Sequence, residues 1–165
     1  MLNEVLSDIG MAKPYILRDS REKVNHGWEF PEDSNFAGTV IAKLKTGDYT
    51  IQGYEDILVV ERKATITEWA ANVFQDRFKN ELERMRSFKF AYILFEFSLE
   101  HLLRFPYGTT IPKQQWPPYD GAVLLRKTLE FQIEYGVHMW MCDDADNASK
   151  LAHSLFKRIV NAKIK

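Results

Sequence analysis

Residues 57–63 have the sequence ILVVERK, in which four apolar residues are followed by three charged ones. Ile57 to Glu61 is typical of a strand that is buried between two layers and carries a charge at its end. Alternate residues of an extended chain point to the same side, so Glu61 and Lys63 are expected to face one pocket, whereas Arg62 points the other way. The stretch therefore predicts a central strand that delivers an acid and a lysine to one place.

Three shorter strands are predicted before this one. They are expected at Pro14–Asp19, Thr39–Ala42 and Tyr49–Ile51. Between the second and third of these strands, Asp48 follows Gly47 at a bend. If the strands of Asp48 and Glu61 are neighbours in a sheet, their two carboxylates can surround one hard cation.

That arrangement suits hydrolysis of a phosphodiester bond. A metal ion there stabilises the extra charge on phosphorus and lowers the pKa of an attacking water. The ammonium of Lys63 can orient that water or help to deprotonate it, and can stabilise the phosphorane charge. The backbone carbonyl of Arg62 is a further candidate metal ligand beside Asp48 and Glu61, and its side chain can tether a carboxylate or a phosphate.

After residue 63 the pattern alternates between helices and strands. Thr65-x-x-Glu68 has the form of a capping box, and apolar residues at helical spacing continue to Met85, which predicts one long helix. Further strands are expected at Phe90–Phe97 and Val137–Cys142, and further helices from Asp120 to about Tyr135 and from Asp143 onward. Residues 101–118 are rich in proline, glycine and aromatic residues and predict an ordered loop with a helical turn. The alternation predicts an α/β sandwich with a mixed central sheet flanked by helices.

The bulk properties exclude several classes of protein. The 165 residues suit one compact domain, expected over residues 14–165 after a mobile or loosely docked leader at residues 1–13. A net charge of −1 means that any DNA contact comes from a local patch. The single Cys142 excludes an intramolecular disulfide and a cysteine-based zinc site, and no run spans a bilayer. The expected location is intracellular, in the cytoplasm, nucleoid or nucleus, without a membrane partner.

Two of the motifs together resemble the XPF-type structure-specific endonuclease family. The family signature is Gly-Asp, a variable gap, Glu-Arg-Lys, three residues and then Asp, and the chain has Gly47-Asp48 and Glu61-Arg62-Lys63. Additional segments are similar to the family's first acidic motif, to its helix after the catalytic strand and to two later strands. These segments are Asp19-Ser20-Arg21-Glu22, Phe74-x-Asp76-Arg77-Phe78, Tyr92–Glu96 and Val137–Trp140. The resemblance covers nearly all of the chain from Pro14 onward.

The resemblance implies a restriction-endonuclease-like, three-layer fold that cuts DNA at branched or single-strand/double-strand junctions, with Mg²⁺ or Mn²⁺ as cofactor. It also implies roles in DNA repair and recombination, and a homodimer or a partner subunit. The residue roles that it implies are metal binding by Asp48 and Glu61, catalysis by Lys63, support from Asp19 and Glu22, positioning of the site or phosphate contact by Arg62, and DNA contacts from Arg77 and Arg84. Arg21 is a further candidate DNA contact.

The chain departs from the family pattern at two points. The position four residues after Lys63, where the family has an aspartate, is Thr67, and Glu68 stands beside it. Either Glu68 takes over the acid's role or the role is absent; we favour Glu68 as the capping-box partner of Thr65. The family's helix-hairpin-helix module does not follow the last helix, so the grip on DNA is expected to come from this domain or from a partner.

Each motif also has an ordinary structural interpretation. Taken singly, Glu61-Arg62-Lys63 is a solvated strand end, Asp48 a turn residue and Asp19-x-Arg21-Glu22 a surface charge cluster. Taken together, these interpretations require a coincidence of order, spacing and strand context. The basic residues between 77 and 89 either contact a phosphate backbone or form a salt-bridged outer helix face. The family match favours a position near the cleft for two of them, Arg77 and Arg84.

Two alternatives to a DNA endonuclease therefore remain open. One is a catalytically weak DNA-binding partner subunit of a nuclease complex, for which Thr67 is the only argument. The other is an RNA nuclease of similar fold, because the cleavage chemistry does not need to distinguish the two sugars.

Overall fold

The computed structural model describes residues 12–22 and 25–164. Of the predicted leader at residues 1–13, residues 1–11 lie outside the described residues. The Lys13 side chain donates hydrogen bonds to a carboxylate oxygen of Glu32 and to the carbonyl oxygen of Asp33, both at 2.7 Å. The domain boundary predicted at residue 14 therefore remains a prediction.

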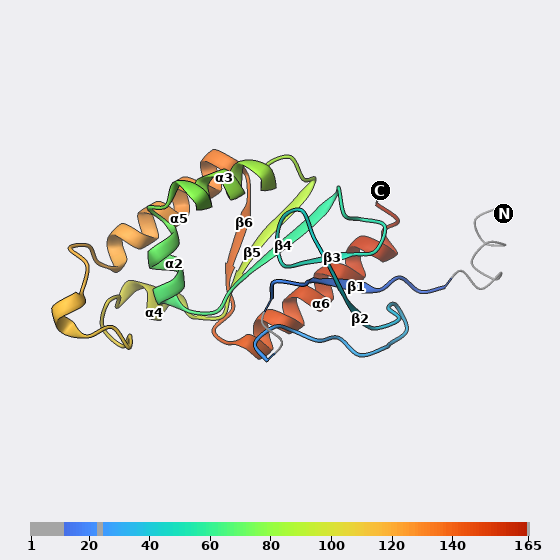
Figure 1. Ribbon diagram of the computed structural model, residues 1–165, viewed down its shortest axis with the longest axis horizontal. Coiled ribbons are helices and arrows are strands. Elements are labelled where there is room, and N and C mark those ends of the chain that lie inside the picture. Colours follow the sequence, from blue (N-terminus) through green and yellow to red (C-terminus); the bar gives the residue numbers. More distant parts are fainter. Residues whose placement is uncertain (1–11, 23–24, 165) are drawn as a thin grey trace.

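A mixed sheet of six strands, in the order β2-β1-β3-β4-β5-β6, forms the centre of the described chain (Figure 1). The strands are β1 Ile16–Asp19, β2 Thr39–Ala42, β3 Tyr49–Ile51, β4 Leu58–Lys63, β5 Phe90–Phe95 and β6 His138–Met141. β1 and β3 are antiparallel, as are β3 and β4, and the remaining neighbours are parallel. Tyr49 pairs with Val60, so the residue before β3, Asp48, lies beside Glu61 as predicted.

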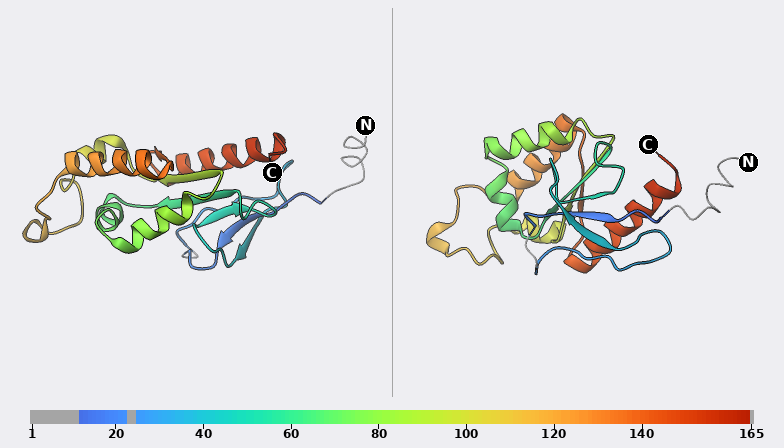
Figure 2. Two further views of the ribbon diagram at one scale, coloured as in Figure 1. Left: turned by 90° about the horizontal axis from the view of Figure 1, so that it is seen from above. Right: turned by 45° about the vertical axis from the view of Figure 1, so that its right-hand side comes forward.

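β4 is the centre of the fold because both of its faces are covered. Val59 belongs to an apolar cluster with residues of α2, α3 and α5, whereas Leu58 and Val60 belong to a second cluster with residues of α6. The right-hand view in Figure 2 shows the sheet between the green and orange helices on one side and the red α6 on the other. The strand extends through Lys63, two residues beyond its predicted end at Glu61, and all six of its residues are buried. The predicted three-layer, restriction-endonuclease-like α/β sandwich is confirmed.

The long helix predicted after Thr65 is two helices, α2 Ile66–Asn72 and α3 Asp76–Met85. The apolar spacing alone does not predict the break, because Ala70, Phe74 and Phe78 follow one another at steps of four residues, which suits a continuous helix. In the structure Phe74 is 48% exposed, whereas Val73 and Phe78 are buried. The chain breaks at Gln75, whose backbone is extended, so that both apolar stripes face the sheet.

The other helices are α4 Leu99–Leu103, α5 Gly121–Tyr135 and α6 Ala145–Asn161, with a short 3₁₀ helix η1 at Lys113–Gln115. The predicted cap at Asp120 is confirmed, since its carboxylate accepts from the N–H groups of Ala122 and Val123. Asp144 caps α6 in the same way, through the N–H of Asn147. Among the described residues, no helix combines the length and apolar character needed to cross a bilayer.

Candidate active site

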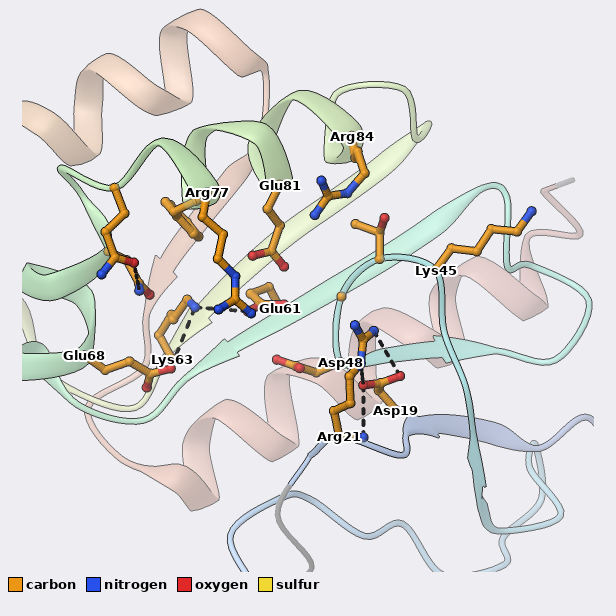
Figure 3. A pocket seen from close by; sticks show the side chains of 15 residues that line it. Asp19, Arg21, Lys45, Asp48, Glu61, Lys63, Glu68, Arg77, Glu81 and Arg84 are labelled. Carbon is orange, nitrogen blue, oxygen red and sulfur yellow. Dashed lines mark hydrogen bonds and ion pairs between the residues drawn. The ribbon is translucent and has the colours of Figure 1, made fainter.

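A cleft of about 320 Å³ lies between the strand ends and helices α2 and α3 (Figure 3). Its charged lining residues are Asp19, Arg21, Lys45, Asp48, Glu61, Lys63, Glu68, Arg77, Glu81 and Arg84. The structure thus brings together seven of the nine side chains predicted for the site. The two that do not line the cleft are Glu22 and Arg62.

Gly47 positions Asp48. The φ of Gly47 is +78°, a backbone conformation that glycine adopts without strain. A Cβ added at Gly47 would lie 2.3 Å from Cγ2 of Val59 and 3.2 Å from the carbonyl oxygen of Val60. The turn therefore packs directly against β4. The Asp48 N–H donates to the carbonyl of Val60 at 2.9 Å, and the Asp48 Oδ2 accepts from the N–H of Arg62 at 2.8 Å. These bonds fix the carboxylate over β4.

Glu61 and Lys63 face the same side of β4, as their spacing predicts. Lys63 Nζ lies 3.0 Å from Glu61 Oε1 and 3.7 Å from Glu68 Oε1, and it stands 5.0 Å from the ring centroid of Phe78 on α3. Both Glu61 and Lys63 are almost fully buried. The second carboxylate oxygen of Glu61, Oε2, is buried and has no hydrogen-bond partner among the described residues.

The electrostatics of the pair suit a bound cation. Burial and the charge of Glu22 raise the pKa of Asp48 to about 7, although the Arg62 N–H favours its ionised form. Burial and the charge of Asp48 raise the pKa of Glu61 well above its usual range. The half-buried Asp48 and the buried Glu61, both with elevated pKa values and one of them with an unsatisfied oxygen, form a donor set that a divalent cation would stabilise.

Direct side-chain ligands at this place are few. Within residues 12–22 and 25–164, no group of three or more histidine, cysteine, aspartate or glutamate side chains is placed to hold one ion together. A cation held by Asp48 and Glu61 would take its remaining ligands from backbone carbonyls, water and substrate oxygens, which is usual for Mg²⁺. The residues present therefore fit such an ion.

Arg62 points to the opposite face of β4, as expected, and does not line the cleft. Its guanidinium donates to Glu22 Oε2 at 3.2 Å, to Glu96 Oε1 at 3.0 Å and to the carbonyl oxygen of His26. The other Glu96 oxygen accepts from the indole N–H of Trp28 at 3.2 Å. This network connects β4 to the end of β5 and to the segment after β1. The side chain of Arg62 therefore stabilises these elements on the face of β4 opposite the cleft.

Asp19 and Arg21 form the edge of the cleft on the β1 side. Asp19 accepts from Nε of Arg21 at 2.7 Å and from the N–H of Leu44 at 2.9 Å, and Arg21 also donates to the Leu44 carbonyl at 2.8 Å. Burial opposes the ionisation of Asp19, but these hydrogen bonds outweigh it and lower the pKa of the carboxyl. The supporting acid is thus engaged in positioning Arg21 and the chain before β3.

On α3, the structure shows which basic side chains face the cleft and which form the salt-bridged outer face of the helix. Arg77 and Arg84 line the cleft, whereas Lys79 and Arg86 lie near Asp76 and Glu83 at 4.0 and 3.7 Å on the exposed side of the helix. The two arginines that the family match favours therefore both line the cleft, and their contact with DNA stays a prediction.

Sequence reasoning missed two charged residues of the cleft, Glu81 and Lys45. Glu96, directly after β5, does not line the cleft and anchors Arg62. The spacing of Glu81 from Arg77 and Arg84, four and three residues, places all three on one helix face and was a signal that could have identified it. Lys45 carried no such signal, because the conformation of its loop is set by tertiary contacts.

Glu68 has the capping role that the sequence analysis favours, and it also lies at the edge of the cleft. The N–H of Glu68 donates to Oγ1 of Thr65 at 3.1 Å, and Glu68 Oε2 accepts from the N–H of Ala64 at 3.0 Å, so the capping arrangement is present. Its other oxygen approaches Lys63 at the edge of the cleft. Thr67 does not line the cleft.

Comparison with known proteins assigns the family. The model of the ERCC4 domain matches residues 18–155, which is most of the chain and includes every predicted site residue. The chain belongs to the ERCC4-domain family. Nucleases of this family generally depend on divalent metal ions, and XPF-type nucleases are members.

Solved structures of ERCC4-domain proteins share the fold. XPF from Aeropyrum pernix aligns with a TM-score of 0.61 and 19% identity over 88% of this chain, and the same protein in complex with DNA aligns with a TM-score of 0.62 and 19% identity over 93%. The chain spans about 61% and 68% of those two chains. No curated protein sequence matches the chain significantly.

Proposed function

We propose that this ERCC4 domain is a divalent-metal-dependent endonuclease that hydrolyses phosphodiester bonds of DNA. The observation that carries the proposal is the pair of carboxylates, Asp48 and Glu61, beside the buried Lys63 in one cleft. A cation bound there, Mg²⁺ or Mn²⁺, would supply Lewis-acid stabilisation of phosphate charge and a more acidic water.

The protein groups then have distinct tasks. Asp48 and Glu61 would hold the cation, with the Arg62 carbonyl as a further candidate ligand. Burial alone would lower the pKa of Lys63, but the charges of Glu61 and Glu68 outweigh it and raise that pKa. Lys63 is therefore an ammonium at neutral pH, which favours orienting water and stabilising negative charge over accepting a proton.

The cations around the acids suit a nucleic-acid backbone. Arg21, Arg77 and Arg84 surround the carboxylates within the cleft, although the whole chain has a net charge of only −1. Such local charge suits contacts to phosphates flanking the scissile bond. We propose DNA with branches or single-strand/double-strand junctions as the substrate class, with a role in DNA repair or recombination.

A catalytically weak partner subunit is the second candidate, and Thr67 is the observation that favours it. The acid of the family signature is absent at this position. Its absence would weaken the binding of metal and would leave the fold unchanged.

Metal binding and cleavage together distinguish the two candidates. The metal-binding experiment is calorimetric titration of Mn²⁺ into the wild type and Asp48→Asn. The nuclease proposal expects binding by the wild type and loss of binding in the variant. The matching cleavage experiment uses labelled flap, splayed-arm, Holliday and single-stranded DNA, with matched RNA strands, in Mg²⁺, Mn²⁺ or EDTA. Wild-type protein that binds Mn²⁺ and leaves every substrate intact would favour the partner-subunit candidate, and preferential cutting of RNA would favour an RNA nuclease.

A further inference from the structure

We propose that Glu81 is a third acid of the cation site, acting on the ion through its charge and through water in the ion's shell. The inference rests on the proposed function and deepens it, because it names a positioning residue outside the family signature. It also explains how the site can work with Thr67 at the position of the missing aspartate.

Glu81 lies on α3 between Arg77 and Arg84, on the helix face that lines the cleft. Figure 3 shows its carboxylate directed from α3 toward Glu61, across the cleft from the turn that carries Asp48. Thr67 lies on α2 and is outside the cleft lining. The acid that α2 does contribute, Glu68, caps that helix and approaches Lys63 at 3.7 Å, whereas Glu81 approaches the site from α3.

The unsatisfied oxygen of Glu61 is an independent observation that points to a ligand. Glu61 is only 6% exposed, lines the cleft, and its Oε1 is already paired with Lys63 at 3.0 Å. Its Oε2 is buried without a hydrogen-bond partner among the described residues. A buried carboxylate oxygen without a partner is costly, and a cation or its bound water would satisfy it.

The charges nearest Glu61 favour a role for Glu81. When both are ionised, as they would be around a bound cation, Asp48 and Glu61 contribute −2 and Lys63 contributes +1, which leaves −1; the carboxylate of Glu81 brings this group of four to −2, equal and opposite to a divalent ion. The charge of Glu81 acts on both Glu61 and Lys63, raising the pKa of each alongside larger effects of burial and nearer charges. Glu81 is therefore electrostatically part of the group.

A role through water follows from the spacing. No three acidic side chains of the described chain are close enough to share one ion directly. Mg²⁺ dehydrates reluctantly and usually keeps several waters when proteins bind it. An acid outside direct reach can accept hydrogen bonds from such waters and lower the ion's energy by its charge.

The test is calorimetric titration of Mn²⁺ into purified wild type, Glu81→Gln, Glu81→Asp and Glu83→Gln at neutral pH, with thermal melts of all four. Glu83 is the matched control, because it is on the same helix, exposed, and paired with Arg86 at 3.7 Å outside the cleft. We expect Glu81→Gln to raise the Mn²⁺ dissociation constant on the order of tenfold. Glu81→Asp keeps the charge and should recover most of the affinity, while Glu83→Gln should match the wild type.

The outcome for Asp48→Asn separates this inference from the proposed function. Loss of Mn²⁺ binding in Asp48→Asn together with wild-type binding in Glu81→Gln would overturn the role of Glu81 and leave the metal site in place. Equal weakening by Glu81→Gln and Glu83→Gln would also overturn it, since the effect would then be one of net charge. Wild-type Mn²⁺ binding in Asp48→Asn would instead contradict the proposed function itself.

Discussion

At the scale of single residues, neighbouring positions on β4 have opposite tasks. Glu61 and Lys63 face the cleft, while Arg62 between them is buried on the other side with Glu22 and Glu96. The alternation of a strand produces this division directly. In the Glu-Arg-Lys motif, the first and third residues therefore face the cleft, and the arginine between them forms ion pairs on the opposite face of the strand.

Arg62→Ala should destabilise the fold, by about 3–5 kcal/mol, because it leaves two buried carboxylates without their cation. Urea denaturation followed by tryptophan fluorescence measures the effect. Arg86→Ala is the matched control, since its ion pair with Glu83 is exposed, and it should change stability by about 0–1 kcal/mol. Equal effects of the two substitutions would contradict the structural role of Arg62.

The raised pKa of Asp48 predicts a pH dependence of the metal-free protein. The carboxyl has a pKa of about 7 in the folded chain against an ordinary value of 3.8, so between these values the folded state binds more protons than the unfolded state. Stability from this group is therefore highest below about pH 4 and falls as the pH rises toward 7. Thermal melts in EDTA across this range should show that Asp48→Asn has a shallower decline than the wild type. An equally steep decline in the variant would contradict the shift.

At the scale of elements, the turn before β3 and the helix after β4 build the cleft. Gly47 allows the turn to lie against Val59 and Val60, and the break between α2 and α3 brings Phe78 over Lys63. Neither contact is local in sequence.

Gly47→Ala should damage the site more than Gly53→Ala. Both glycines have positive φ, +78° and +87°, but a Cβ at Gly47 meets Val59 and Val60 whereas a Cβ at Gly53 meets nothing within 4 Å. We expect Gly53→Ala to cost about 1 kcal/mol and Gly47→Ala about 1–3 kcal/mol more. Urea denaturation gives the stabilities, and Mn²⁺ titration should show weaker binding only for Gly47→Ala. Unimpaired binding in Gly47→Ala would show that the turn does not position Asp48.

The sequence predicted those parts of the site that depend on local pattern. The strand at residues 58–63, the bend at Gly47 and the shared direction of Glu61 and Lys63 follow from periodicity and glycine chemistry. The split at Gln75 and the position of Glu81 depend on how α3 packs against the sheet. The apolar spacing gave no signal for the split, because Ala70, Phe74 and Phe78 at steps of four residues suit a continuous helix.

At the scale of the whole molecule, the charge is nearly balanced while the cleft concentrates charges of both signs. DNA binding is therefore expected to depend on a few cleft cations and to be sensitive to salt.

Arg77→Gln and Arg84→Gln should each weaken DNA binding and reduce the slope of log affinity against log salt by about 1, if each contacts one phosphate. Arg126→Gln is the control, because Arg126 lies on α5 near Glu130 at 3.8 Å, outside the cleft. Fluorescence anisotropy with a labelled splayed-arm duplex in EDTA at several salt concentrations measures all three. A control variant with the same loss as the cleft variants would contradict a local binding surface.

The most direct measurement is cleavage of an end-labelled splayed-arm duplex by wild type and Asp48→Asn, each with Mn²⁺, Mg²⁺ or EDTA. The structure and the family predict cutting by the wild type with a divalent cation, none in EDTA, and none by Asp48→Asn, whose melting curve should show an intact fold. Cutting by the wild type in EDTA, or equal cutting by both proteins in Mn²⁺, would contradict metal-dependent catalysis at Asp48 and Glu61.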